Sequence, residues 1–307
     1  MNILPQRHVW PSVFWAGEQP RRILLNRRWA SEMAWGVRPA FLRSQRFRKT
    51  HLFAGPWVGE FGWELMGWQG LIRALRTHYD HITVCARESS AALYTDCCDA
   101  FVPHQIKGQS NAHVVFDVAN PEELTRTLDL VPNDADHLRP LRYVPLSSQS
   151  FVRFGDRSQS SDHVDVLLHA RGNAVAAGRN WPREKWLQLV TFLNKAGLRV
   201  GAIGLSSATL PIEGISDFRD QPLEATMNLV AGAKMVVGPS SGPMHLASLC
   251  GTPHIVWTDR RLYSMRRRSR DLYERFWNPL GTSVEVIDEY GFDPPVEVVS
   301  RLIEDRL

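Results

Sequence analysis

Two stretches of the chain alternate short apolar runs with segments of helical periodicity, and this alternation limits the possible folds strongly. In the first stretch, the run at 51–54 stops at Gly55-Pro56, residues 64–78 place apolar side chains on one helical face, and a β-branched run follows at 81–86. A strand, a glycine turn, a helix and a second strand form a βαβ unit. The first stretch therefore predicts a parallel sheet with a right-handed crossover.

The second alternation begins at residue 164, and its helices are bounded by proline and glycine in the expected places. The expected strands are 164–169, 198–204, 235–238 and 254–257, and the expected helices are 183–195, 223–233 and 243–249. Two such halves predict an α/β chain with two Rossmann-like parallel-sheet domains facing each other across a cleft.

The segment between the two halves is less regular. Residues 88–130 predict an Ala-rich helix with short strands at 100–102 and 113–118, and the polar, Pro- and Ser-containing segment 131–162 is expected to hold the interdomain boundary. The predicted organisation is an N-terminal extension at 1–50, an N-terminal domain at 51–155, a C-terminal domain at 160–285, and a segment 286–307 ending in a helix that packs back on the N-terminal domain.

Composition indicates a globular protein, since 44% of residues are hydrophobic and 22% are charged. No apolar run approaches the roughly 20 residues that a membrane-spanning helix needs, and no signal-peptide pattern opens the chain. We therefore expect a cytoplasmic protein. The four cysteines and eleven histidines show no metal-ligand spacing, so we expect no metal site and no cofactor.

Positive charge is concentrated at the N-terminus. Residues 1–50 hold ten Lys/Arg against Glu18 and Glu32, a net +8, whereas the remaining 26 basic and 30 acidic residues give −4. Such an arm could face lipid head groups, which would place the protein at the inner membrane face, or nucleic acid, or an anionic acceptor. A solvated arm explains the same charges equally well.

The segment Gly238-Pro-Ser-Ser-Gly-Pro-Met-His245 places small residues between an expected strand and an expected helix. Backbone N–H groups at such a helix N-terminus suit an anion such as a diphosphate, and the hydroxyl of Ser240 or Ser241 could add a donor or cap the helix. An ordinary capped turn would explain the glycines and serines alone. His245 is as readily a packed histidine as a ligand contact.

Two arginines follow the strand expected at 164–169. Arg171 and Arg179 surround a loop that contains Gly172 and Gly178, at the strand end where ligands collect in open α/β sheets. Because arginine can make bidentate phosphate contacts, both are candidates for the same diphosphate.

The whole string 238–253, which ends in a Gly-Thr-Pro turn, resembles the donor-binding motif of the bacterial lipopolysaccharide heptosyltransferases, glycosyltransferase family nine. The resemblance extends to Leu168-His-Ala-Arg171, to Arg179-Asn-Trp-Pro182 with the helix after it and, more loosely, to Gly59-Glu60. It implies the GT-B fold and a nucleotide-diphosphate sugar donor. Ser240 stands where the family's motif has an Asp, so the resemblance does not specify heptose as the donor sugar.

The resemblance also suggests roles for individual residues. Glu60 matches the family's catalytic Asp, which makes it the expected general base of an inverting, metal-independent transfer, and Glu64 could orient it or bind the acceptor. The expected acceptor is a glycan, a lipid-linked glycan or a nucleic acid. The residues expected to bind the donor diphosphate are Arg171, Arg179, Gly238, Ser240, Ser241, Gly242 and His245.

Two other functions fit the sequence. A GT-B-fold nucleotide-sugar epimerase would share the diphosphate site and would turn over the donor without an acceptor. A non-enzymatic nucleic-acid or membrane-binding module would depend on the basic arm and would bind with a steep salt dependence.

Overall fold

The computed structural model describes residues 49–107, 119–140, 146–160, 162–174, 176–260 and 269–307. The chain divides into two compact units, with the boundary between Ser150 and Phe151. That boundary lies inside the polar segment 131–162. The basic arm, the strand expected at 113–118 and most of the arginine-rich segment 260–270 lie outside the described residues.

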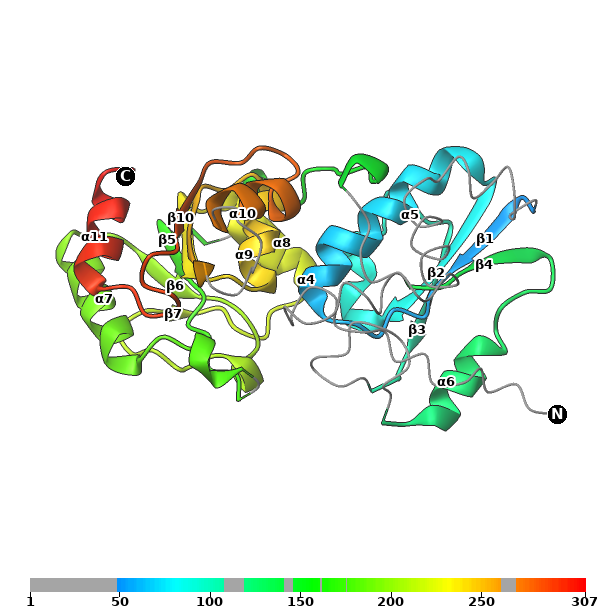
Figure 1. Ribbon diagram of the computed structural model, residues 1–307, viewed down its shortest axis with the longest axis horizontal. Helices are drawn as coiled ribbons and strands as arrows, with labels where there is room; N and C mark the ends of the chain where they lie inside the picture. Colours follow the sequence, from blue (N-terminus) through cyan, green and yellow to red (C-terminus); the bar gives the residue numbers. More distant parts are fainter. Residues whose placement is uncertain (1–48, 108–118, 141–145, 161, 175, 261–268) are drawn as a thin grey trace, which may run out of the picture. The chain divides into compact units, whose positions relative to one another are not determined.

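The first unit is built on a parallel four-stranded sheet of order β3-β2-β1-β4 (Figure 1). Its strands are β1 (His51–Ala54), β2 (His81–Arg87), β3 (Ala100–His104) and β4 (Ala135–Leu138). Its helical segments are α4 (Phe61–Trp63), the π-helix η1 (Glu64–Trp68), α5 (Gln69–Leu75), the 3₁₀ segments η2 (Arg76–His78), η3 (Glu88–Leu93) and η4 (Leu146–Ser148), and α6 (Pro121–Leu128). The βαβ unit predicted for 51–86 is confirmed, whereas the helix expected after residue 88 is a short 3₁₀ turn.

The apolar face predicted for residues 64–78 is buried along its whole length. Leu65, Trp68, Leu71, Ile72 and Leu75 are each at most 2% exposed. The helix, however, is not a continuous α-helix, because the Gln69 N–H donates to the carbonyl of Glu64, five residues back, and η1 is therefore a π-turn.

The second unit is built on a parallel six-stranded sheet of order β10-β9-β8-β5-β6-β7. Its strands are β5 (Val166–Leu168), β6 (Val200–Ala202), β7 (Ser216–Asp217), β8 (Met235–Pro239), β9 (His254–Trp257) and β10 (Val284–Ile287). Its helical segments are η5 (Arg157–Gln159), η6 (Ala177–Arg179), α7 (Arg183–Lys195), η7 (Ser206–Ala208), α8 (Leu223–Gly232), α9 (Gly242–Cys250), α10 (Ser269–Trp277) and α11 (Val296–Glu304). The second alternation is thus confirmed element by element.

Three tryptophans form the centre of the core of this unit. Trp181, Trp186 and Trp257 are each at most 1% exposed, and their ring centroids lie 4.8, 5.1 and 5.5 Å apart. The Trp181 indole N–H donates to the carbonyl of Pro294 at 3.0 Å, which satisfies its buried polar group.

The final helix belongs to this same core. The apolar face of α11 (Val296, Val299 and Ile303) is buried with α7 and β9, so this face is used within the second unit. A helix's periodicity identifies the face that is buried but not the surface that buries it.

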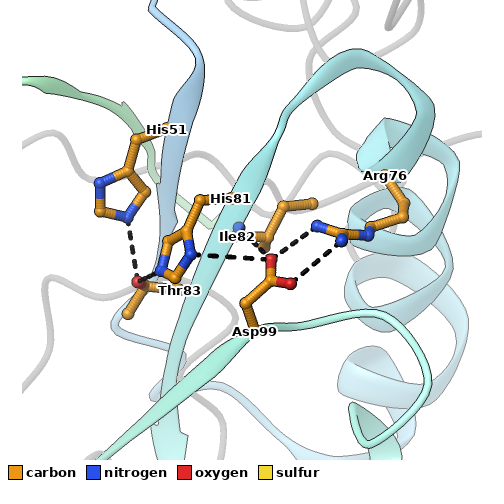
Figure 2. Close-up of polar contacts among 6 residues, drawn as sticks. All are labelled: His51, Arg76, His81, Ile82, Thr83 and Asp99. Atoms are coloured by element: carbon orange, nitrogen blue, oxygen red, sulfur yellow. Dashed lines mark hydrogen bonds and ion pairs between the residues drawn. The ribbon is translucent and has the colours of Figure 1, made fainter.

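The amino ends of the first unit's strands carry a separate polar cluster (Figure 2). The Thr83 hydroxyl lies 3.0 Å from His51 Nε2 and 3.3 Å from His81 Nε2. Asp99 forms a bidentate ion pair with Arg76 at 2.6 and 3.0 Å and accepts the Ile82 N–H at 2.7 Å. These bonds connect η2 and the start of β2 to the start of β3. They lie at the amino ends of the strands, whereas the loop after β1 lies at the carboxyl ends.

Candidate functional site

The turn between β8 and α9 is held by backbone hydrogen bonds to β9 and to its own N-cap residue. The Ser240 N–H donates to the Trp257 carbonyl at 2.9 Å, and the N–H groups of Met244 and His245 both donate to the Ser241 carbonyl at 3.1 Å. Ser241 is the N-cap residue, but its hydroxyl donates to the Pro239 carbonyl at 2.8 Å. The side-chain cap that the sequence allows is therefore not formed, and the Ser241 hydroxyl does not bind the N–H groups at the positive end of α9.

Gly238 lies where three elements pack tightly together. A Cβ at this position would lie 3.1 Å from the Cβ and the carbonyl oxygen of His169 and 3.1 Å from the Met244 sulfur. His169 follows β5 and is buried under the turn, where burial lowers its pKa to about 4, helped by the charges of Arg171 and Arg179. The imidazole is therefore neutral at physiological pH.

Arg179 lies against the turn itself. Its guanidinium donates to the carbonyl of Ser240 and stacks over the Phe292 ring, 5.1 Å from the ring centroid. This places a permanent positive charge beside the residue that leads into α9. Arg179 and Ser240, which the sequence placed in one site, are in direct contact.

Arg171 has a different position. It is 8% exposed, and its guanidinium donates to the carbonyl of Ala176 at 3.1 Å and to the side-chain oxygen of Asn180. The Asn180 amide in turn donates to the Asn173 carbonyl at 2.9 Å. Arg171 therefore shapes the loop that carries Arg179, and Asn180, which the sequence analysis did not single out, is its partner.

His245 packs inside the unit. It is 5% exposed, and its ring stacks on Trp277 with the centroids 4.2 Å apart and the planes 13° apart. Burial, together with the charge of Arg179 and the neighbouring His254, keeps its pKa well below the ordinary value. In the described part of the chain its Nδ1 has no hydrogen-bond partner. These contacts favour the packed-histidine interpretation.

In the first unit, Glu60 and Glu64 have opposite environments. Glu60 is exposed and directly precedes α4. Glu64 is 0% exposed, and its two carboxylate oxygens accept hydrogen bonds from Ser90 at 2.9 Å and Tyr94 at 2.8 Å. Burial raises the pKa of Glu64 to about 7, against the opposing effects of Tyr94, Ser90 and Arg87. The Glu64 carboxyl group is therefore enclosed within the first unit, with both of its oxygens hydrogen-bonded.

The π-turn that carries Glu64 is stabilised by amide side chains. The Gln69 amide donates to the Leu65 carbonyl and the Gln149 amide to the Met66 carbonyl, both at 2.8 Å. Single π-turns are uncommon and often accompany functional sites.

Three side chains that the sequence analysis did not select hold the loop before Glu60: Arg87, His104 and His137. Arg87 and His104 end β2 and β3, and ligand-site residues in parallel sheets gather at carboxyl ends of strands. That rule could have found Arg87, since it directly follows the predicted run 81–86. His137 lies on β4, which has too little β-branched character to be predicted.

Within the described ranges, no group of three or more His, Cys, Asp or Glu residues is placed to hold a metal ion. The helices of that same part of the chain include none with the length and apolar character needed to cross a bilayer.

The two parallel-sheet units and the Gly-rich turn before α9 define a chain with the fold of nucleotide-sugar glycosyltransferases. The E. coli ADP-heptose lipopolysaccharide heptosyltransferase II is similar with a TM-score of 0.56 and 15% identity, over 83% of this chain and 98% of that one. A glycosyl transferase family 9 protein from Veillonella parvula is similar with a TM-score of 0.51 and 14% identity, over 78% of this chain and 86% of that one.

These likenesses include both sheets, because each unit holds only about half of the chain. The predicted GT-B class, with two Rossmann-like parallel sheets, is thereby confirmed, and the resemblance seen in the motifs holds at the level of the fold. No protein-family model matches the sequence, and the search of curated proteins found no significant match.

Proposed function

We propose that this chain transfers a sugar from a nucleotide-diphosphate sugar to a glycan, lipid-linked or nucleic-acid acceptor, inverting the anomeric carbon without a metal ion. The observation that carries the proposal is the contact of Arg179 with Ser240 at the start of α9. It joins a fixed cation to the positive end of a helix dipole, and both favour a diphosphate. The sheet topology supports the same site, since the turn follows the carboxyl end of β8.

In the proposed reaction, Glu60 takes the proton of the acceptor hydroxyl as its oxygen bonds to the anomeric carbon. The bond from that carbon to the diphosphate breaks on the opposite face, and the electron pair leaves with the diphosphate. Arg179 and the N-terminal end of α9 stabilise the charge that develops there. Arg171 holds the loop that carries Arg179. Gly238 has no side chain and lets the backbone of the turn come close to the diphosphate.

Nucleotide binding tests the site without knowledge of the sugar. ADP, UDP, GDP and CDP are compared in a thermal-shift measurement, each against its monophosphate. At least one diphosphate should raise the melting temperature more than its monophosphate, because only the folded state binds; saturation at 100 times Kd adds about 2.7 kcal/mol of stability. Failure of all four diphosphates to raise the melting temperature would argue against the donor site.

Two further parts of the proposal have their own tests. Turnover should survive EDTA treatment if the transfer needs no metal. Residues 1–50, with their net +8, are proposed to contact an anionic acceptor at the inner membrane face or elsewhere in the cytoplasm, so acceptor binding should weaken as salt rises.

A further inference from the structure

The loop between β1 and α4, residues 55–60, is held mainly through its carbonyl groups. The Gly55 carbonyl accepts a hydrogen bond from His137 Nε2 at 2.7 Å, and the Trp57 carbonyl accepts one from His104 Nε2 at 2.8 Å. The guanidinium of Arg87 donates to the carbonyls of Val58 and Gly59, the second at 2.8 Å. Side chains from β2, β3 and β4 thus all point to the loop that follows β1.

Two of these donors act as a pair. Arg87 and His104 are register partners at the carboxyl ends of β2 and β3. Together they bind three consecutive carbonyls, those of Trp57, Val58 and Gly59, and the next residue is Glu60. On its other side, the Glu60 carbonyl accepts the N–H groups of Trp63 at 3.1 Å and Glu64 at 3.0 Å. The backbone of Glu60 is therefore fixed from both directions.

The hydrogen bonds of His104 determine its tautomer. Its Nδ1 accepts the Ile106 N–H at 3.1 Å, so Nδ1 carries no proton. A carbonyl can only accept, and Nε2 must therefore carry the proton that it donates to Trp57. Burial and the charge of Arg87 both lower the pKa of His104, which keeps this neutral form. His104 is thus a fixed donor with both nitrogens in use.

We propose that Arg87 and His104 are positioning residues that fix the backbone of Glu60 for proton abstraction. This inference rests on the proposed function, in which Glu60 is the base. Its physical reason is that an exposed carboxylate on a free loop would sample many positions, whereas catalysis needs one geometry, and a misplacement of about 1 Å can cost about 100-fold in rate.

The principal variants are Arg87→Gln and His104→Phe. The glutamine amide ends near the position of the arginine Nε, short of the two carbonyls that the guanidinium contacts, and phenylalanine has no donor. Arg87→Lys and His104→Gln each keep one donor. Glutamine can present an N–H close to the position of Nε2, so His104→Gln should retain most of the activity. Arg76→Gln is the matched control, because it removes an arginine with a bidentate partner, Asp99, from the opposite edge of the same sheet (Figure 2).

Two measurements are made on each full-length variant. Hydrogen exchange follows the amides of Trp57 and Glu64, which donate to the Cys85 and Glu60 carbonyls. Steady-state kinetics separates kcat from the KM for the donor. Arg87→Gln and His104→Phe should speed exchange of these amides by about tenfold or more and lower kcat on the order of 100-fold, with the donor KM within about threefold.

The expected pattern also includes Arg87→Lys with intermediate kcat and Arg76→Gln with loop exchange and kcat as in the wild type. A purely structural role would instead move kcat and the donor KM together with overall stability, and that result would overturn the inference. Wild-type loop exchange and wild-type kcat in Arg87→Gln would also overturn the inference. If Glu60→Gln were inactive in the same assay, the proposed function would remain intact. Full turnover in Glu60→Gln would show that Glu60 is not the base, and it would overturn both proposals.

Discussion

The backbone N–H of Glu64 donates to the carbonyl of Glu60 at 3.0 Å, yet the two carboxylates have opposite surroundings. Glu60 is exposed at the start of α4, and Glu64, on the π-turn, is fully buried with Ser90 and Tyr94. One helical turn thus separates an exposed carboxylate from one that is buried and hydrogen-bonded. The sequence alone does not show this difference in burial, because both residues lie at the start of the same apolar face.

This difference predicts different effects of the same substitution. Glu60→Gln keeps the size of the side chain but removes the base, so turnover should fall by about 100-fold or more while donor binding is unchanged. Glu64→Gln keeps an oxygen that accepts from Tyr94 or Ser90 and should leave most of the turnover. Initial rates and donor affinity measured on both variants check this, and equal losses in the two would contradict the assignment.

Glu64 also predicts how the stability of the first unit depends on pH. Its pKa is about 7 in the folded state against 4.5 ordinarily, so the folded protein binds this proton more tightly than the unfolded chain does. The resulting stability is fully present below about pH 4.5 and is lost as the pH rises through about 7, with a total change of order 3 kcal/mol.

Glu64→Gln should remove this pH dependence, since an amide does not titrate. The stability of the first unit is compared in the wild type and the variant by denaturant unfolding at pH 5, 6, 7 and 8. Hydrogen exchange of the α5 amides monitors the unfolding. The variant should gain stability relative to the wild type as the pH rises. A constant difference between the two proteins at all four values would show that the carboxyl does not titrate in this range.

Buried histidines give the second unit the opposite dependence. Burial lowers the pKa of both His169 and His254 to about 4, and that of His245 lies well below its ordinary value of 6.5. The unfolded chain therefore binds these protons more readily than the folded unit does. Stability is fully present above about pH 6.5 and is lost as the pH falls toward 4.

Hydrogen exchange at pH 7 and pH 5, corrected for the intrinsic rates, should therefore show β8 and α9 losing more protection in acid than α5. In the first unit, the loss from the lowered pKa values of His104 and His137 is opposed by the gain from Glu64. His254→Asn, which removes one of the titrating groups, should reduce the acid loss. Equal loss of protection in both units at pH 5 would contradict the separate pH dependences.

The sequence predicted the fold well where periodicity and glycine turns determine it. The apolar face from Leu65 to Leu75 is buried as predicted, because a single widened turn shifts the register of the face too little to change which residues lie inward. Strand β4, with the sequence Ala-Asp-His-Leu, was not predicted. It lacks β-branched residues and exists because it pairs with β1.

The site was predicted less completely, because contacts between distant residues decide it. The turn at 238–242 follows from local sequence, and so does its position after a strand. Nothing local shows that Arg171 is buried against Asn180, or that Arg87 and His104 end neighbouring strands in register. Residue type and spacing therefore gave the two arginines, 171 and 179, the same role, and only the fold separates them.

That separation makes a final prediction. Arg179→Ala should weaken binding of the nucleoside diphosphate by about 10- to 100-fold, the value of one or two charge-assisted hydrogen bonds, with little change in stability, because the side chain is only half-buried. Arg171→Ala should also lower stability, since Asn180 and the Ala176 carbonyl lose a buried partner. Calorimetric titration and thermal melts of both variants check this. Arg183→Ala, which removes an exposed ion pair with Glu213, is the control and should change neither quantity measurably. If Arg179→Ala bound the diphosphate as the wild type does, Arg179 would have no role in the donor site.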